Sequence, residues 1–158
     1  MMELSTKRFR VVLAADHGGV TLKGELSEFL ARHGVPVRDL GTGTADPVDY
    51  PDYGFAAAEE VRTGEADRAI LLCKSGIGMA IAANKVVGIR AALVASVEEA
   101  ERSRRHNDAN VLVLSATGTS SEKAFRIVEA WLAAPFEGGR HSRRIDKIRA
   151  FETAHWRE

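Results

Sequence analysis

The chain has 158 residues and a mass of 17.1 kDa, and its 45% hydrophobic and 28% charged residues fit one globular domain. Its 22 basic and 22 acidic side chains give a formal net charge of zero, which argues against a general nucleic-acid or membrane-surface binder. The single cysteine, Cys73, excludes an internal disulfide and a multi-cysteine zinc site, and no apolar run suits a membrane span or a signal peptide. We therefore expect a cytoplasmic protein with a reduced thiol.

Apolar runs typical of buried strands alternate with amphipathic segments along the whole chain. Residues 69–73 carry no charge, which is typical of a central strand, and Ser96 with Glu99 forms the capping box of a helix. In chain order we expect a strand at 9–15, a helix at 20–33, a strand at 35–40, a helix at 52–62, a strand at 69–73, a helix at 79–86, a strand at 88–94, a helix at 96–105, a strand at 111–114, and helices at 120–132 and 140–149.

Five strands that are each followed by a helix predict a single α/β domain of Rossmann-like or flavodoxin-like type. Its sheet would be open, five-stranded and parallel, with helices on both faces. In such sheets, ligands bind beyond the carboxyl ends of the strands, at a switch point in the strand order. The segments that follow the expected strands are Asp16-His17, residues 41–50, Cys73 to Gly78, Ala95-Ser96 and Ser115 to Gly118.

The segment from Cys73 to Gly78 is the most informative of these. Its two glycines let the backbone approach a ligand, and a thiolate at a strand end can act as a nucleophile or a base. A buried structural cysteine before an ordinary glycine turn explains the segment equally well. A dinucleotide fingerprint is a poor alternative because Ile81 stands where its third glycine would be, and no Gly-Lys-Ser/Thr follows to make a P-loop.

Three further segments have an ordinary interpretation beside a functional one. His17, beside Asp16, can bind an anion or move protons, or the pair can simply cap a turn. Arg140 and Arg144 are four residues apart and would share a helix face as a phosphate clamp, or they belong to a solvated tail. His106 follows two arginines at the end of a helix, where the helix dipole alone favours such residues. No pair of histidines has metal-ligand spacing with a carboxylate, so we expect no metal site.

Taken together, these segments resemble the type B ribose-5-phosphate isomerases, a family that also includes galactose-6-phosphate isomerase subunits. The likeness covers about residues 9–151, which leaves 1–8 as an N-terminal extension and 152–158 as a C-terminal tail. The matching segments are Ala15-Asp16-His17-Gly18-Gly19 with Leu22-Lys23, Asp49-Tyr50-Pro51, Ser75-Gly76-Ile77-Gly78, Ile81-Ala82-Ala83-Asn84-Lys85, Gly88-Ile89-Arg90-Ala91, His106-Asn107-Asp108-Ala109-Asn110-Val111-Leu112 and Glu137-Gly138-Gly139-Arg140-His141.

The resemblance implies an enzyme of the pentose phosphate pathway, an aldose–ketose isomerase. It would interconvert ribose 5-phosphate and ribulose 5-phosphate by ring opening and proton transfer through a cis-enediolate. The family's roles fall on these residues: His106 and Asp16 in ring opening, Cys73 as the base at C2, Ser75 and the backbone at Lys74, Gly76, Ile77 and Gly78 at the enediolate, His17, Arg140 and Arg144 at the phosphate, and Tyr50 and Asn107 at the sugar.

The resemblance also bears on cofactors and assembly. It implies no metal or organic cofactor, and a homodimer or tetramer in which residues of two chains complete each site. In this arrangement His106 and the basic C-terminal segment would serve the Cys73 of the other chain. A second branch of the family places the base on a glutamate, but Met79 stands there in this chain and cannot accept a proton.

Two positions depart from the family pattern. Lys74 replaces a glycine, and Thr117 replaces an arginine that contacts the phosphate, a loss that could cost about 1.5–3 kcal/mol. The side chain of Lys74 either points away from the site or contacts the substrate. Two alternatives therefore stay open: the same chemistry on a tetrose, hexose or other sugar, and a non-catalytic module that binds a phosphosugar.

Overall fold

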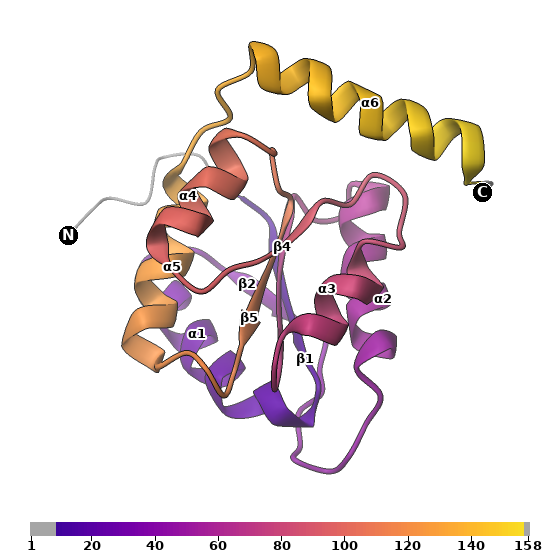
Figure 1. Cartoon of the computed structure of the whole chain (residues 1–158). Helices are drawn as coiled ribbons and strands as arrows, with labels where there is room; N and C mark the ends of the chain where they lie inside the picture. Colours follow the sequence, from indigo (N-terminus) through magenta and orange to yellow (C-terminus); the bar gives the residue numbers. More distant parts are fainter. Residues whose placement is uncertain (1–8, 157–158) are drawn as a thin grey trace.

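The computed structural model describes residues 9–156, so the expected extension at 1–8 lies outside the described residues, as do 157–158 (Figure 1). None of the described helices is long and apolar enough to cross a membrane. In chain order the elements are β1 (Val11–Ala15), the 3-10 helix η1 (His17–Gly19), α1 (Val20–Arg32), β2 (Val37–Asp39), α2 (Tyr50–Thr63), β3 (Arg68–Cys73), α3 (Ile77–Ala83), β4 (Ala91–Leu93), α4 (Val97–Arg105), β5 (Val111–Ser115), α5 (Ser121–Ala133) and α6 (Arg140–His155).

The five strands form one parallel sheet in the order β2-β1-β3-β5-β4, which confirms the predicted fold class. β3 lies at the centre, with the uncharged run at 69–73 buried as predicted, and it begins one residue earlier at Arg68, which is also buried. The order reverses between β1 and β3, because the chain runs outward from β1 to β2 and then returns to the other side of β1. A switch point of this kind is where ligands bind in such sheets.

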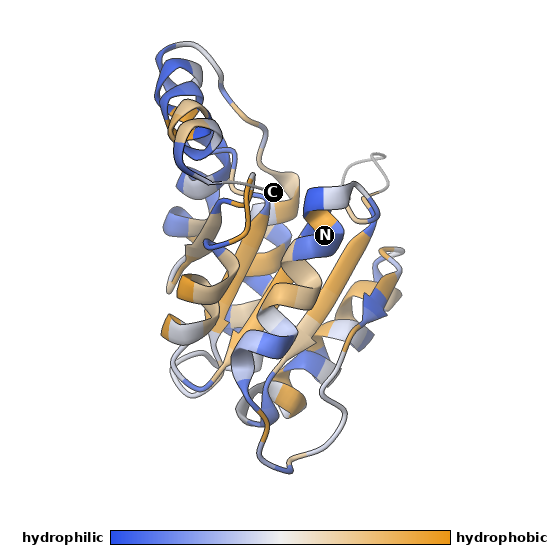
Figure 2. Cartoon of the chain, turned by 90° about the vertical axis from the view of Figure 1, so that its right-hand side faces the viewer, coloured by the Kyte–Doolittle hydropathy of each residue, from blue (hydrophilic) through white to orange (hydrophobic). Residues whose placement is uncertain are grey.

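Helices cover both faces of the sheet. In Figure 1, α1, α4 and α5 lie on one side and α2 and α3 on the other. Large side chains fill the first face, among them Leu26, Leu30 and Trp131, which are fully buried. The second face is packed with smaller residues such as Ala57 and Ala83, which bring α2 and α3 close to the strands. Figure 2 shows the apolar strands enclosed between helices that are polar on their outer sides.

Helix α6 stands apart from both layers and crosses the end of the sheet (Figure 1). It continues to His155, beyond the expected end at residue 149 and into the segment assigned to the tail. Ile145 is buried, whereas Ile148 and Phe151 are 47% and 57% exposed. The carboxylate of Glu152 accepts a hydrogen bond from the Gly88 N–H at 3.2 Å, which ties the far end of α6 to the loop before β4. The helix therefore presents an apolar stripe that this chain leaves open.

Candidate functional site

Asp16 and Cys73 lie side by side at the carboxyl edge of the sheet. Ala15 pairs with Leu72 across β1 and β3, so the next residue of each chain segment is Asp16 on one side and Cys73 on the other. Asp16 is 6% exposed, and its Oδ1 accepts a hydrogen bond from the Gly18 N–H at 2.9 Å. This bond caps η1 and leaves Oδ2 for another partner.

The turn after β3 fixes the sulfur of Cys73. Gly76 has a φ of 78°, and its N–H donates a hydrogen bond to Sγ at 3.1 Å. A Cβ at Gly76 would lie 2.5 Å from Cδ1 of Leu93 and 3.2 Å from the carbonyl carbon of Leu114. Both the left-handed conformation and the lack of space therefore require glycine here. Cys73 itself is only 4% exposed, so the thiol sits at the inner wall of the site.

The backbone amides of this turn fall into two groups. Those of Gly76 and Ile77 are occupied, the first by the sulfur and the second by Oγ of Ser75 at 3.2 Å. Within residues 9–156, the N–H groups of Ser75 and Gly78 have no hydrogen-bond partner. These two amides are the donors that an anionic oxygen of a ligand can use.

Tyr50 covers the same turn from the start of α2. A Cβ on Gly78 would lie 2.5 Å from Cζ of the Tyr50 ring and 2.7 and 2.9 Å from its two Cε atoms. The ring therefore rests on the glycine, and a side chain at position 78 would displace it. Tyr50 is 39% exposed, so the outer part of the ring stays accessible to a ligand.

His17 is held in one tautomer by the neighbouring loop. The N–H of Val48 donates a hydrogen bond to Nδ1 of His17 at 3.2 Å. Because Nδ1 accepts, the neutral ring carries its proton on Nε2, which is then a donor toward a ligand. The position beside Asp16 thus combines a hydrogen-bond donor with a carboxylate acceptor.

Lys23 anchors the start of the 41–50 loop, a role that the sequence did not reveal. Its side chain is buried, and Nζ donates to Oδ1 of Asp39 at 2.6 Å and to the carbonyl of Thr42 at 2.7 Å. One signal was available: Lys23 shares the apolar face of its helix with Leu26 and Leu30, where a lysine needs partners. Through this anchor, the start of the 41–50 loop is fixed against α1.

Lys74 points toward the site and not away from it. A Cβ on Gly18 would lie 2.4 Å from Cγ and 3.4 Å from Cε of Lys74, so the lysine stem runs across that glycine. Its carbonyl accepts three hydrogen bonds, from Oγ of Ser115 at 2.8 Å and from Oγ1 and N–H of Thr117 at 2.7 and 3.1 Å. Thr117 is therefore occupied with the backbone of Lys74.

The remaining predicted residues gather at the amino-terminal edge of the sheet. His106 and Asn107 end α4, and the N–H of Glu137 donates to the Arg105 carbonyl at 3.1 Å, which brings the start of α6 beside them. Arg140 and Arg144 lie exposed on the first turns of α6, on one face as predicted.

An arginine pair shapes the turn that carries His106 and Asn107. Asp108 has a φ of 47°, and its carboxylate meets Arg104 at 2.9 Å and Arg90 at 3.4 Å. Arg90 also donates to the carbonyls of Asn107 and Asp108, each at 2.9 Å. Sequence reasoning gave Arg104 only the role of a basic residue at a helix end, although Asp108 follows it at i+4. It gave Arg90 no role, because Asn107 and Asp108 are distant in the chain and only the fold brings them to Arg90.

His141 packs against His106, which sequence spacing did not predict. The two rings stack with centroids 4.4 Å apart and planes 11° apart. Burial, followed by the positive charges of Arg140 and of a protonated His106, lowers the pKa of His141, so the neutral ring is favoured. Ligand atoms of His106, Glu137 and His141 lie within 4.8 Å of one another, but parallel rings do not direct their lone pairs at one point. The two histidines of this cluster therefore have the geometry of a stacked imidazole pair.

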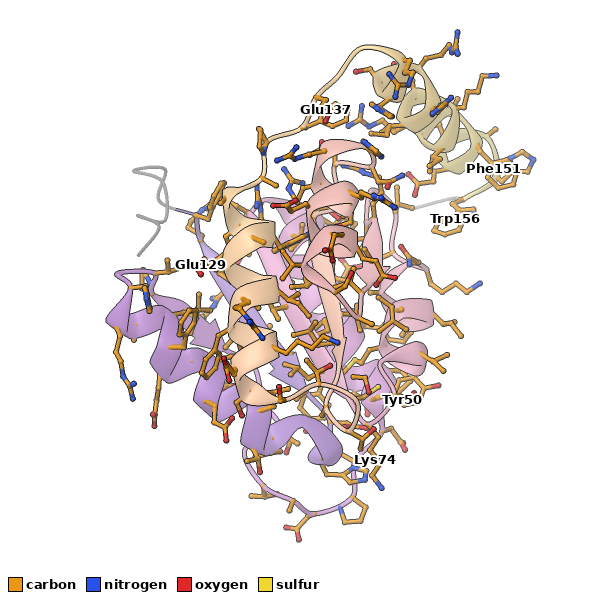
Figure 3. The ribbon with its side chains drawn as sticks, turned by 60° about the vertical axis from the view of Figure 1, so that its left-hand side comes forward. Tyr50, Lys74, Glu129, Glu137, Phe151 and Trp156 are labelled. Carbon is orange, nitrogen blue, oxygen red and sulfur yellow. The ribbon has the colours of Figure 1, made fainter. Side chains whose placement is uncertain are left out.

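The predicted site is thus divided between the two ends of the sheet. Figure 3 shows Tyr50 and Lys74 at one end of the molecule and Glu137, beside the His106 cluster, at the other. The six residues of β3 separate the two ends by roughly 20 Å at the usual rise of a strand. The structure therefore brings together Asp16, His17, Tyr50, Cys73, Lys74, Ser75, Gly76, Ile77 and Gly78 in one cluster, and His106, Asn107, Arg140 and Arg144 in another.

Comparison with known proteins gives one consistent result. The family model described as Ribose/Galactose Isomerase matches residues 11–148. The ribose-5-phosphate isomerase B of Escherichia coli is 43% identical over 143 residues, which cover 90% of this chain and 96% of that protein.

Solved structures agree with this match. A structure of Clostridium thermocellum ribose-5-phosphate isomerase B superposes with a TM-score of 0.91 at 46% identity and covers 92% of this chain and 99% of its own. A Mycoplasma genitalium structure, ribose-5-phosphate isomerase B with bound ribulose-5-phosphate, superposes at 0.88 with 44% identity, and covers 92% of this chain and 97% of its own.

Proposed function

Because this chain belongs to the ribose/galactose isomerase family, we propose that it is an aldose–ketose isomerase that interconverts ribose 5-phosphate and ribulose 5-phosphate. The observation that carries the proposal is the pairing of Cys73 with Asp16 at adjacent strand ends, beside two amides that are open to a ligand. A buried thiol, a carboxylate and oxyanion donors are what proton transfer next to a carbonyl requires.

In the proposed reaction, the sugar ring opens first. His106 gives a proton to the ring oxygen as the bond from that oxygen to C1 breaks, and Asp16 accepts the proton of the C1 hydroxyl. The stack with His141 orients the His106 ring, and its neutral partner adds no second positive charge there. The product is the open-chain aldehyde with its carbonyl at C1.

Proton transfer follows on the open chain. The Cys73 thiolate takes the proton from C2, the electron pair moves into the C1–C2 bond, and the carbonyl oxygen becomes an enediolate oxygen. The amides of Ser75 and Gly78 and the hydroxyl of Ser75 donate to that oxygen. The proton then returns from sulfur to C1 while the C2 hydroxyl passes its proton to the enediolate oxygen on C1, which gives the ketose with its carbonyl at C2 and a hydroxyl at C1. Met79, at the position of the alternative glutamate base, is fully buried in the core.

Each active site on this proposal is completed by a second copy of the chain. A pentose phosphate cannot span the length of the sheet, so Cys73 and the His106 cluster of one chain cannot act on one molecule. The open apolar stripe of α6 supports an interface: with Ile89 and Ala91 of the β4 edge, Ile148 and Phe151 line a groove of about 610 Å³. A homodimer that pairs opposite ends brings the two clusters together twice.

Exchange of the C2 proton tests the function. The protein is incubated with ribose 5-phosphate in deuterated water and followed by NMR, and we expect ribulose 5-phosphate with deuterium incorporated from solvent. Ribose, erythrose 4-phosphate and a hexose 6-phosphate are run in parallel, because Lys74 and Thr117 depart from the family pattern. Thermal stabilisation by a sugar phosphate without exchange or ketose would identify a binding module instead.

We expect Gly78→Ala to raise KM for the sugar phosphate about 3- to 30-fold while the fold is kept. The new methyl group takes the place of the Tyr50 ring, and the backbone at position 78 does not need a left-handed conformation. Steady-state kinetics and a melting curve measure the two effects. In the Tyr50→Ala background, the same substitution should change KM no further; a second full increase there would contradict the displacement of the ring.

A further inference from the structure

Contacts at both the backbone carbonyl and the side-chain stem position Lys74. Three donors converge on its carbonyl, and its stem lies across Gly18, a residue with no side chain to obstruct it. The rest of the side chain is exposed, so the ammonium lies at the surface of the cluster that contains Cys73. Among residues 9–156, Lys74 forms no ion pair with any carboxylate. The backbone and the stem of Lys74 are therefore positioned beside Gly18, and its ammonium has no ion-pair partner within the described residues.

The neighbours of Lys74 indicate what this charge would bind. Gly18 follows His17, whose neutral ring carries its proton on Nε2, and one oxygen of Asp16 already accepts a hydrogen bond from the Gly18 N–H. The edge near Gly18 thus offers an ammonium and an imidazole donor together. A neutral hydroxyl would gain little from an ammonium, whereas a phosphate dianion gains both from its charge and from its several acceptor oxygens.

We propose that Lys74 is a specificity-determining residue that binds the phosphate group of the substrate from the same chain as Cys73. The inference rests on the proposed function, since it takes the substrate to be a phosphosugar. Thr117 is a positioning residue in this arrangement, because its hydroxyl and N–H fix the Lys74 carbonyl and not the ligand. The phosphate is then held by Lys74 and His17 of one chain and by the Arg140 and Arg144 cluster of the other.

Kinetics of Lys74→Met test the proposal. We expect KM for the phosphosugar to rise about 10- to 100-fold with kcat little changed, because a charged contact to a group remote from C1 and C2 acts equally before and during proton transfer. Turnover of unphosphorylated ribose should stay the same. Added salt should raise KM less in the variant than in the wild type. Lys123→Met, in the first turn of α5, removes the same charge at a residue outside the proposed site and should leave all values unchanged.

A double-mutant cycle with Gly18 separates this role from a general effect on the fold. A methyl group at Gly18 collides with the Lys74 stem, so Gly18→Ala should raise KM in the wild type. In Lys74→Gly this collision is removed and only the 3.3 Å approach of the methyl group to Oδ1 of Asp16 remains, so Gly18→Ala should raise KM less than it does in the wild type. Thr117→Val, which removes one of the three donors to the Lys74 carbonyl, should raise KM in the same direction but less.

The outcomes separate the two proposals. If the wild type turns over no phosphosugar, the proposed function fails before Lys74 is tested. If the wild type is active and Lys74→Met leaves KM unchanged, the phosphate contact is wrong. If Lys74→Met lowers kcat for ribose and ribose 5-phosphate alike, Lys74 acts at the enediolate, and the phosphate assignment is overturned too.

Discussion

Cys73→Ala should lower kcat for ribose 5-phosphate about 10²- to 10⁴-fold, the range that a positioned base supplies, with KM little changed. The substitution removes the sulfur that accepts the C2 proton and the hydrogen bond of the Gly76 N–H, whereas the Ser75 and Gly78 amides make no contact with the sulfur and should stay in place. Initial rates of ketose formation and the rate of deuterium uptake at C2 should fall together. Both depend on the same proton transfer.

The fold has to be followed in parallel, because Cys73 is buried in the core. Loss of one sulfur leaves a small cavity, for which we expect a loss of about 1 kcal/mol in the free energy of unfolding. Cys73→Ser fills most of that space with a weaker base, so it should be nearly as inactive yet more stable. Near wild-type turnover in either variant would show that the base lies elsewhere.

Mixing two inactive variants should restore activity if the clusters at opposite ends of the sheet meet across a dimer. Chains carrying Cys73→Ala and chains carrying His106→Asn each lack one half of every site. After subunit exchange in equal amounts, half of the dimers are mixed and each has one intact site, so about a quarter of the wild-type activity should return. The effect is large because each variant alone should be almost inactive.

A matched mixture provides the control. Cys73→Ala and Asp16→Asn lie in the same cluster, so no mixed dimer of these two chains contains an intact site. This mixture should stay inactive at any ratio. Equal recovery in both mixtures, or a monomeric mass by light scattering at the working concentration, would show that the site is not shared between chains.

Much of the fold was predictable because its signals are local. The strands other than β2 are mainly apolar runs between turn formers, and α4 begins at the predicted cap, Ser96. The turn after β3 was also predicted, since Gly76 and Gly78 follow the apolar run of the strand. Alternating strands and helices then imply a parallel sheet, and parallel strands place Asp16 and Cys73 at one edge.

The sequence by itself thus determined the fold class, the edge where chemistry is expected and the family resemblance that assigns roles to residues. The tertiary structure alone decided which of those residues meet. It placed His106 at the far end of the sheet from Cys73, stacked it on His141, and directed Lys74 over Gly18 with Thr117 on its carbonyl. The physical reason is that these contacts join segments far apart in the chain, so their geometry depends on how helices and strands pack and not on any local pattern.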